Sequence, residues 1–166
     1  MIKKALLIFI LIFALIFCSC QKEQQSTQTL LVSLLEVSGE SLESNGIFYF
    51  SDVDEGEIGY FSTEDKALMY GKDNAEHVFD KIESCAVFVS SRAPGELAVF
   101  KCYSASDTDD VERMCLERAD EIKVALHNTE WREKSESISV KVHKRYVLFA
   151  FVQSVMTAEG RFKELI

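Results

Sequence analysis

The sequence contains few of the residues that interrupt regular secondary structure: one proline and seven glycines among 166 residues. It has only three histidines, and it contains neither a Gly-x-Ser-x-Gly motif nor a glycine-rich phosphate-binding loop. The low Pro and Gly content excludes a collagen-like chain and a Pro/Gly-rich disordered chain. The missing motifs exclude a serine-hydrolase elbow and a P-loop. We therefore expect a domain rich in helices and strands, without a known catalytic motif.

Basic residues are also in the minority, with 18 Lys and Arg against 27 Asp and Glu and a net charge of −9. A surface of this sign repels the phosphates of nucleic acids and the headgroups of anionic lipids. We therefore expect no nucleic-acid partner. Any membrane association has to come from an anchor and not from the charged surface.

The first twenty residues contain such an anchor. Two lysines precede an apolar run, residues 5–17, which is shorter than the roughly 20 residues that span a bilayer and fits the core of a signal peptide. The run ends in FCSC, residues 17–20, which resembles a bacterial lipobox. The resemblance implies cleavage between Ser19 and Cys20 and acylation of Cys20, so that two or three acyl chains hold the protein stably in the membrane. An uncleaved anchor helix or an ordinary signal peptide is the alternative.

These features divide the chain into three parts. Residues 1–19 are predicted to be a lipoprotein signal peptide, residues 20–29 a flexible tether anchored to lipid, and residues 30–166 a single globular domain. From Cys20 onward the chain has 147 residues, with 16 basic and 27 acidic side chains and a net charge of −11. The predicted location is the extracytoplasmic face of the cell membrane.

The first half of the domain is predicted to mix short helices and strands. The apolar run 30–37 predicts a helix, and the runs 47–50 and 58–61 on either side of SDVDEGE predict a loose hairpin. Helical spacing predicts two further short helices over 63–70 and 74–82, the first closed by Gly71.

The second half has a clearer pattern. Residues 85–90 and 97–103 predict a hairpin around Pro94-Gly95, and residues 107–128 predict the longest helix. A second hairpin over 138–142 and 145–152 and a closing helix over 155–165 follow. The expected α+β fold has two β-β-α units that form a four-stranded antiparallel sheet with both helices on one face. Because 145–152 is apolar on both sides, the segment 30–82 is expected to cover the other face.

Several motifs of this half occur together in one known family. The motifs are AVFVSS followed by GELAVFK, the helix DTDDVERMCLERADEIKVAL and the hairpin VKVHKRYVLFAFV. Together they resemble domain of unknown function 4358, a family of small bacterial lipoproteins, over residues 70–165. The resemblance implies a lipid-anchored α+β domain and no particular activity.

Metal and cofactor chemistry has little support in the sequence. Asp73, Glu76, His77 and Asp80 have helical spacing, but one histidine among carboxylates is typical of a solvated helix face and not of a closed zinc site. The acidic stretch 52–57 lacks the glycine and the final glutamate of a calcium loop. We expect no metal and no cofactor.

The remaining cysteines lie in apolar patterns. A register in which Ser90 pairs with Leu97 places Cys85 opposite Cys102, and a disulfide can then form outside the cell. The alternative is free, buried thiols, which are unreactive. Cys115 points from the long helix toward the sheet and is expected to be free in both cases.

The leading functional hypothesis is a non-catalytic extracytoplasmic lipoprotein that binds an envelope protein or a small ligand. The alternative is a hydrolase-like envelope enzyme with a site that no motif reveals, which requires titratable groups to converge in a pocket. A third hypothesis is a module that works by strand addition, which requires an uncharged, unprotected edge strand.

Overall fold

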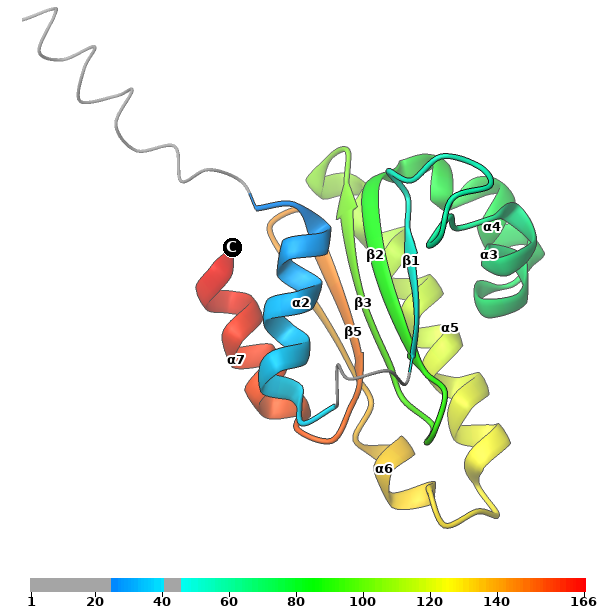
Figure 1. Cartoon of the computed structure of the whole chain (residues 1–166), viewed down its shortest axis with the longest axis vertical. Coiled ribbons are helices and arrows are strands. Elements are labelled where there is room, and N and C mark those ends of the chain that lie inside the picture. Colours follow the sequence, from blue (N-terminus) through cyan, green and yellow to red (C-terminus); the bar gives the residue numbers. More distant parts are fainter. Residues whose placement is uncertain (1–24, 41–45) are drawn as a thin grey trace, which may run out of the picture.

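The computed structural model describes residues 25–40 and 46–166 (Figure 1). The predicted signal peptide, Cys20 and the first half of the predicted tether lie outside these residues. The described part is an α+β fold in which six helices pack against a five-stranded antiparallel sheet. Two short 3-10 helices, η1 (Phe79–Lys81) and η2 (Ala105–Asp107), connect these elements. The helices and strands are α2 (Thr27–Ser38), β1 (Gly46–Phe50), α3 (Thr63–Tyr70), α4 (Lys72–His77), β2 (Ile82–Ser90), β3 (Glu96–Cys102), α5 (Thr108–Leu126), α6 (Arg132–Glu136), β4 (Ser139–His143), β5 (Tyr146–Phe151) and α7 (Val155–Leu165).

The sheet has the strand order β1-β2-β3-β5-β4, and every neighbouring pair is antiparallel. β5 lies inside the sheet and all of its residues are buried. Because successive side chains of a strand point to opposite faces, Phe149 joins the core on one face and Leu148 the core on the other. The expectation that both faces of the sheet are covered is confirmed.

The two helices that follow the hairpins, α5 and α7, lie on opposite faces of the sheet, so the prediction that they share one face is wrong. On one face Cys115 and Ile122 of α5 pack with Phe149, and α3 contributes to the same core. The expectation that the segment 30–82 covers the face opposite α5 is therefore wrong for α3, although α2 does lie on that opposite face. On the other face Phe162 of α7 packs with α2 and with Leu148 (Figure 1). The physical reason is that α5 and α3 already occupy one face. α7 buries its apolar stripe by covering the second face beside α2. There the two helices also keep each other's apolar side chains away from water.

The predicted hairpin over 47–50 and 58–61 is also wrong, because only its first half is a strand. β1 pairs with β2 along its whole length, and the second run forms one isolated parallel bridge, from Tyr60 to Phe50. Phe61 is only 1% exposed and its ring packs against Tyr49 and Phe79. The run is apolar because the loop inserts an aromatic side chain into the core, not because it pairs as a strand. The sheet gains its fifth strand from β1.

α2 begins three residues earlier than its apolar run suggests. The side chain of Ser26 accepts a hydrogen bond from the backbone N–H of Thr29 at 3.1 Å, which caps the first turn. The last three residues of the predicted tether, 27–29, are therefore helical. Only four residues, 21–24, lie between Cys20 and the first described residue, Gln25.

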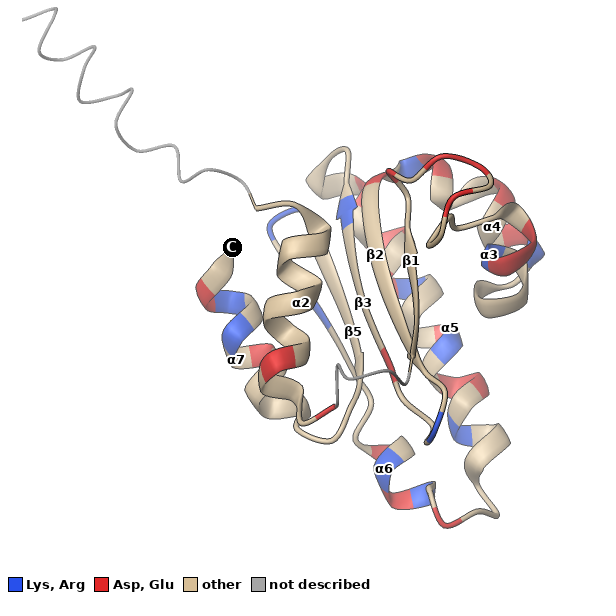
Figure 2. Ribbon diagram, in the orientation of Figure 1, with Lys and Arg blue, Asp and Glu red and all other residues tan. Residues whose placement is uncertain are grey.

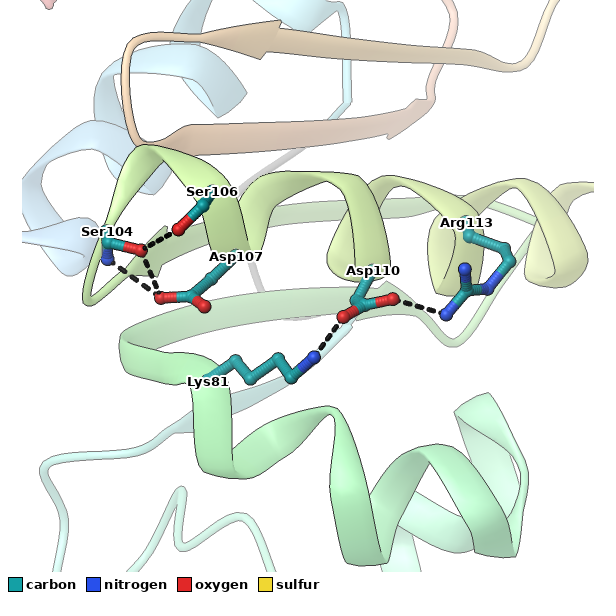
Figure 3. A network of polar contacts seen from close by, with 6 residues as sticks. All are labelled: Lys81, Ser104, Ser106, Asp107, Asp110 and Arg113. Atoms are coloured by element: carbon teal, nitrogen blue, oxygen red, sulfur yellow. Dashed lines mark hydrogen bonds and ion pairs between the residues drawn. The ribbon is translucent and has the colours of Figure 1, made fainter.

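A polar network holds the start of α5 (Figure 3). Ser104 donates from its backbone N–H and from its hydroxyl to the carboxylate of Asp107, at 3.0 and 2.6 Å. One turn further along, Asp110 lies between Lys81 and Arg113 and pairs with both. Hydrogen bonds from Lys81 and then from Arg113 lower the pKa of Asp110. The network joins η1 to α5 and so fixes the point at which α5 starts to cross the sheet.

Candidate ligand groove

A groove of about 340 Å³ opens where the β2–β3 hairpin meets the C-terminal half of α5. A hollow with apolar walls and few polar groups is the usual form of a small-molecule site. Arg118, Glu121 and Ser90 are among its polar lining groups, together with Glu96 at the start of β3. The apolar walls are formed by Val89, Pro94, Ile122, Ala125, Leu126 and Phe151.

One wall of the groove is a single stripe of α5. The lining residues of this helix are spaced three or four apart, which places them on one helical face. This face carries its charged residues, Arg118 and Glu121, at one end and the apolar Ala125 and Leu126 at the other. The groove is therefore amphipathic along the helix axis.

Glu96 is the most buried acidic side chain of the groove, with 2% exposure. Its Oε1 accepts a 2.9 Å hydrogen bond from the hydroxyl of Tyr70. Its Oε2 accepts two hydrogen bonds from Arg118, from Nε at 3.1 Å and from Nη2 at 3.0 Å. Hydrogen bonds between a guanidinium and a carboxylate are charge-assisted and strong, and two of them from Arg118 to one oxygen fix the direction of the contact. This contact joins β3 to α5, and the hydrogen bond from Tyr70 joins α3 to the same carboxylate.

The charge states in this cluster are set mainly by burial. Burial raises the pKa of Glu96, and the charge of Arg118 and the bond from Tyr70 oppose that rise. Burial, followed by the nearby Glu96 charge, raises the pKa of Tyr70 well above its ordinary value. For Arg118 burial lowers the pKa, but attraction to Glu96 outweighs it and the net shift is upward. The guanidinium therefore stays charged, and the phenol stays neutral and can donate.

No sequence motif indicates a functional role for Glu96, Arg118 or Tyr70. The available signal was one acidic residue at the start of the strand ELAVFKC, directly before four apolar residues. By strand alternation its side chain lies on the same face as Ala98 and Phe100, toward α5. A charged side chain on a buried face requires a partner, and Arg118 lies on the helix that crosses that face.

The predicted register between the two cysteine-bearing strands is wrong by two residues. Cys85 pairs with Phe100, and Cys102 pairs with Ile82 across a shift in the ladder. The hairpin is closed by a hydrogen bond from the backbone N–H of Ser90 to the carbonyl of Gly95, and Val89 then pairs with Glu96. The expected opposition of Cys85 and Cys102 is absent, and both are free thiols, as is Cys115.

All three thiols belong to the core between the sheet and α5. Burial raises the pKa of Cys85 to about 12 and that of Cys102 to about 11. Burial also raises the pKa of Cys115 well above its ordinary value. Because the thiolate is the reactive form of cysteine, these thiols are unreactive at neutral pH and serve as small apolar core residues.

The acidic residues considered for a metal site are spread over two elements. Asp73, Glu76 and His77 lie on α4 and Asp80 on η1, and all four are exposed. Glu76 pairs with Lys72 at 3.7 Å. Within residues 25–40 and 46–166, no group of three or more His, Cys, Asp or Glu side chains is placed to hold a metal ion.

Comparison of the chain with protein-family models, with curated proteins and with solved structures found no match. The resemblance to domain of unknown function 4358 therefore remains a prediction from the quoted motifs. In the part of the chain that the structure describes, every helix is too short or too polar to cross a membrane.

Proposed function

We propose that the protein is an extracytoplasmic lipoprotein, anchored through Cys20, whose domain binds without catalysis a small molecule with an apolar body and a cationic amine. The groove between the β2–β3 hairpin and α5 carries this proposal. Its walls are apolar, and its charged lining consists of Glu96, Glu121 and Arg118. Arg118 forms two hydrogen bonds to Glu96 and lies 3.7 Å from Glu121. The lining therefore has one acidic charge in excess, which favours a cation.

The position of the groove relative to the anchor supports this role. The five Cα-to-Cα steps from Cys20 to Gln25 reach at most about 18 Å, so the proposed anchor holds the N-terminus of α2 close to the lipid. α2 is about 18 Å long. At its far end Glu40 pairs with Lys134, which also donates to the carbonyl of Pro94 in the groove wall. The groove thus lies at the end of α2 that is remote from the anchor, where a dissolved molecule can reach it.

The alternative, a hydrolase-like envelope enzyme, has one observation in its favour: Glu96 has a raised pKa and lines the groove. A general acid must reach the substrate. Both oxygens of Glu96 already accept hydrogen bonds, from Tyr70 and Arg118. This arrangement favours a residue that holds the groove together over one that transfers protons.

Calorimetric titration of the full chain in neutral detergent tests ligand binding. The probes are 2-phenylethylamine and 3-phenylpropionate, which have similar bodies and opposite charges. We expect the amine to bind several-fold more tightly. Glu121→Gln should remove most of that preference, since exposed charge pairs contribute up to about 1 kcal/mol. Asp120→Asn, at the preceding residue of α5 and outside the groove lining, is the matched control. Equal binding of both probes contradicts the proposed ligand class.

The anchor has its own test, so its failure can be told apart from failure of the groove. The intact mass of protein extracted from membranes should lack residues 1–19 and include acyl chains on Cys20. A full-length, unmodified mass contradicts lipidation and leaves the groove proposal unaffected.

A further inference from the structure

The edge strand β1 differs from the strand at the opposite edge of the sheet. β1 has the sequence GIFYF, with no charged residue and no proline, and Ile47 is 53% exposed. β4 at the other edge carries Lys141 and His143, and Lys141 pairs with Glu159 of α7 at 3.6 Å. Charged side chains protect an edge strand against pairing with another chain. β1 lacks this protection.

Among the residues that the structure describes, the outer edge of β1 is closed only at its last residue. The backbone N–H of Phe50 donates to the carbonyl of Gly59 at 2.7 Å, on the side away from β2. Because backbone groups alternate between the two edges of a strand, the N–H and C=O groups of Phe48 and Gly46 point to the same outer side. Within residues 25–40 and 46–166, no backbone hydrogen bond beyond that of Phe50 closes this edge.

An apolar hollow of about 590 Å³ accompanies the open edge, and we call the two together the β1 edge site. The hollow is lined by Gly46, Ile47, Phe48, Phe50, Ile58 and Gly59. Ile58 is fully exposed. A hollow beside an open strand fits one side chain of an added strand, because alternate side chains of such a strand point to the same face.

Negative charge lies beside one end of the β1 edge site. The loop between β1 and α3 contains Asp52, Asp54, Glu55 and Glu57, all exposed, and it stands out in Figure 2 as an acidic segment beside the top of β1. Among the described residues, no Lys or Arg forms an ion pair with these four. An occupant of the site that carries basic residues therefore gains attraction from this loop.

We propose that the β1 edge site binds an extended, basic segment of a partner protein as a sixth strand of the sheet. The open groups of Gly46 and Phe48 form the backbone ladder, an apolar side chain enters the hollow against Ile58, and a basic side chain faces the loop 52–57. A second copy of this chain fits less well, because GIFYF offers no basic residue and the two copies have net charges of the same sign. The site is separate from the ligand groove, and its occupation does not depend on that proposal.

Nuclear magnetic resonance titration of the full chain in neutral detergent tests the proposal. The probes are three synthetic hexapeptides: KVTVTK, its acidic match EVTVTE, and KPTPTK, in which prolines remove backbone donors. We expect KVTVTK to shift the amide signals of residues 46–49 and 58. It should bind at least about tenfold more tightly than either other peptide, and added salt should weaken it.

Two variants locate the binding. Ile58→Asn should weaken KVTVTK about tenfold, because it removes the apolar contact without adding charge, and because Ile58 is fully exposed the fold should tolerate the change. Leu68→Asn, at an exposed apolar residue of α3 outside the hollow, should leave binding unchanged. Equal affinities for the three peptides, or shifts confined to other strands, overturn the proposal. So does a dimer in sedimentation experiments that Ile58→Asn dissociates, because it would make a second copy the occupant.

Discussion

The hydroxyl of Tyr70 donates a 2.9 Å hydrogen bond to Oε1 of Glu96, 26 residues further along the chain. The ring of Tyr70 packs edge-on against Phe100 and Phe61, so that an aromatic cluster holds the donor in place. Arg118 binds the other oxygen of the same carboxylate. One buried side chain therefore fixes the positions of α3, β3 and α5, and with them one end of the groove.

Removing the hydrogen bond from Tyr70 to Glu96 should lower the stability of the protein without changing its fold. Tyr70→Phe keeps the ring and leaves Oε1 of Glu96 buried without its donor, which costs about 1–3 kcal/mol. Urea denaturation of the full chain in neutral detergent measures the change. Tyr103→Phe is the control, because Tyr103 is 62% exposed and its change should stay within about 0.5 kcal/mol. Equal losses for both variants would contradict the role of Tyr70.

The guanidinium of Arg118 should contribute more than an ordinary surface charge. Arg118→Met leaves Glu96 as an uncompensated buried acid, which costs about 3–5 kcal/mol. The double variant Glu96→Gln/Arg118→Met should be more stable than Arg118→Met alone, because it also removes the stranded charge. Arg113→Met breaks an exposed pair with Asp110 and should cost about 1 kcal/mol or less. The denaturation midpoints of the three variants test this prediction. Similar losses of stability for Arg118→Met and Arg113→Met would contradict the larger contribution of Arg118.

Stability should fall steeply in alkaline solution because of the buried thiols. Their pKa values are raised from 9.0 in the folded protein, to about 12 for Cys85 and about 11 for Cys102. The unfolded chain therefore loses these protons first. The stabilisation is complete below pH 9 and is lost as the pH rises through the folded pKa values. Each thiol contributes a slope of about 1.4 kcal/mol per pH unit within its window.

Denaturation under reducing conditions between pH 7 and 11 measures this slope. Cys115 is the third thiol with a raised pKa, so Cys85→Ala should reduce the slope between pH 9 and 10 by about one third. It should leave the flat region near pH 7 flat, although the stability itself is lower there. An unchanged slope would show that Cys85 keeps no extra proton in the folded state.

The elements with strong periodicity were predictable from the sequence, and their placement was not. The helix predicted over 107–128 is α5 at Thr108–Leu126, and the helix predicted over 155–165 is α7 with the same bounds. The face that α7 covers depends on which side of β5 is still open, and β5 is apolar on both sides. The local hydrophobic pattern therefore could not decide which face of the sheet α7 covers.

The register error has a similar cause. Pairing Cys85 with Cys102 or with Phe100 leaves every side chain on the same face, because a shift of two residues preserves the alternation of a strand. The hydrophobic pattern is therefore equally consistent with both registers. The structure has the second register, in which Glu96 meets Arg118 and Tyr70. These residues lie 22 and 26 positions apart, and no local spacing joins them.

Two glycines should respond in opposite directions to the same substitution. Gly160 lies exposed inside α7, and a Cβ added there meets no atom within 4 Å. Gly160→Ala should therefore stabilise the protein by about 0.5–1 kcal/mol, since alanine loses less backbone entropy in a helix. Gly46 starts β1, and a Cβ there would lie 2.0 Å from Cε2 of Phe88. Gly46→Ala should force the strand and the Phe88 ring apart and lower stability by about 1–3 kcal/mol. Urea denaturation of both variants tests the pair, and a loss of stability in Gly160→Ala or none in Gly46→Ala would contradict it.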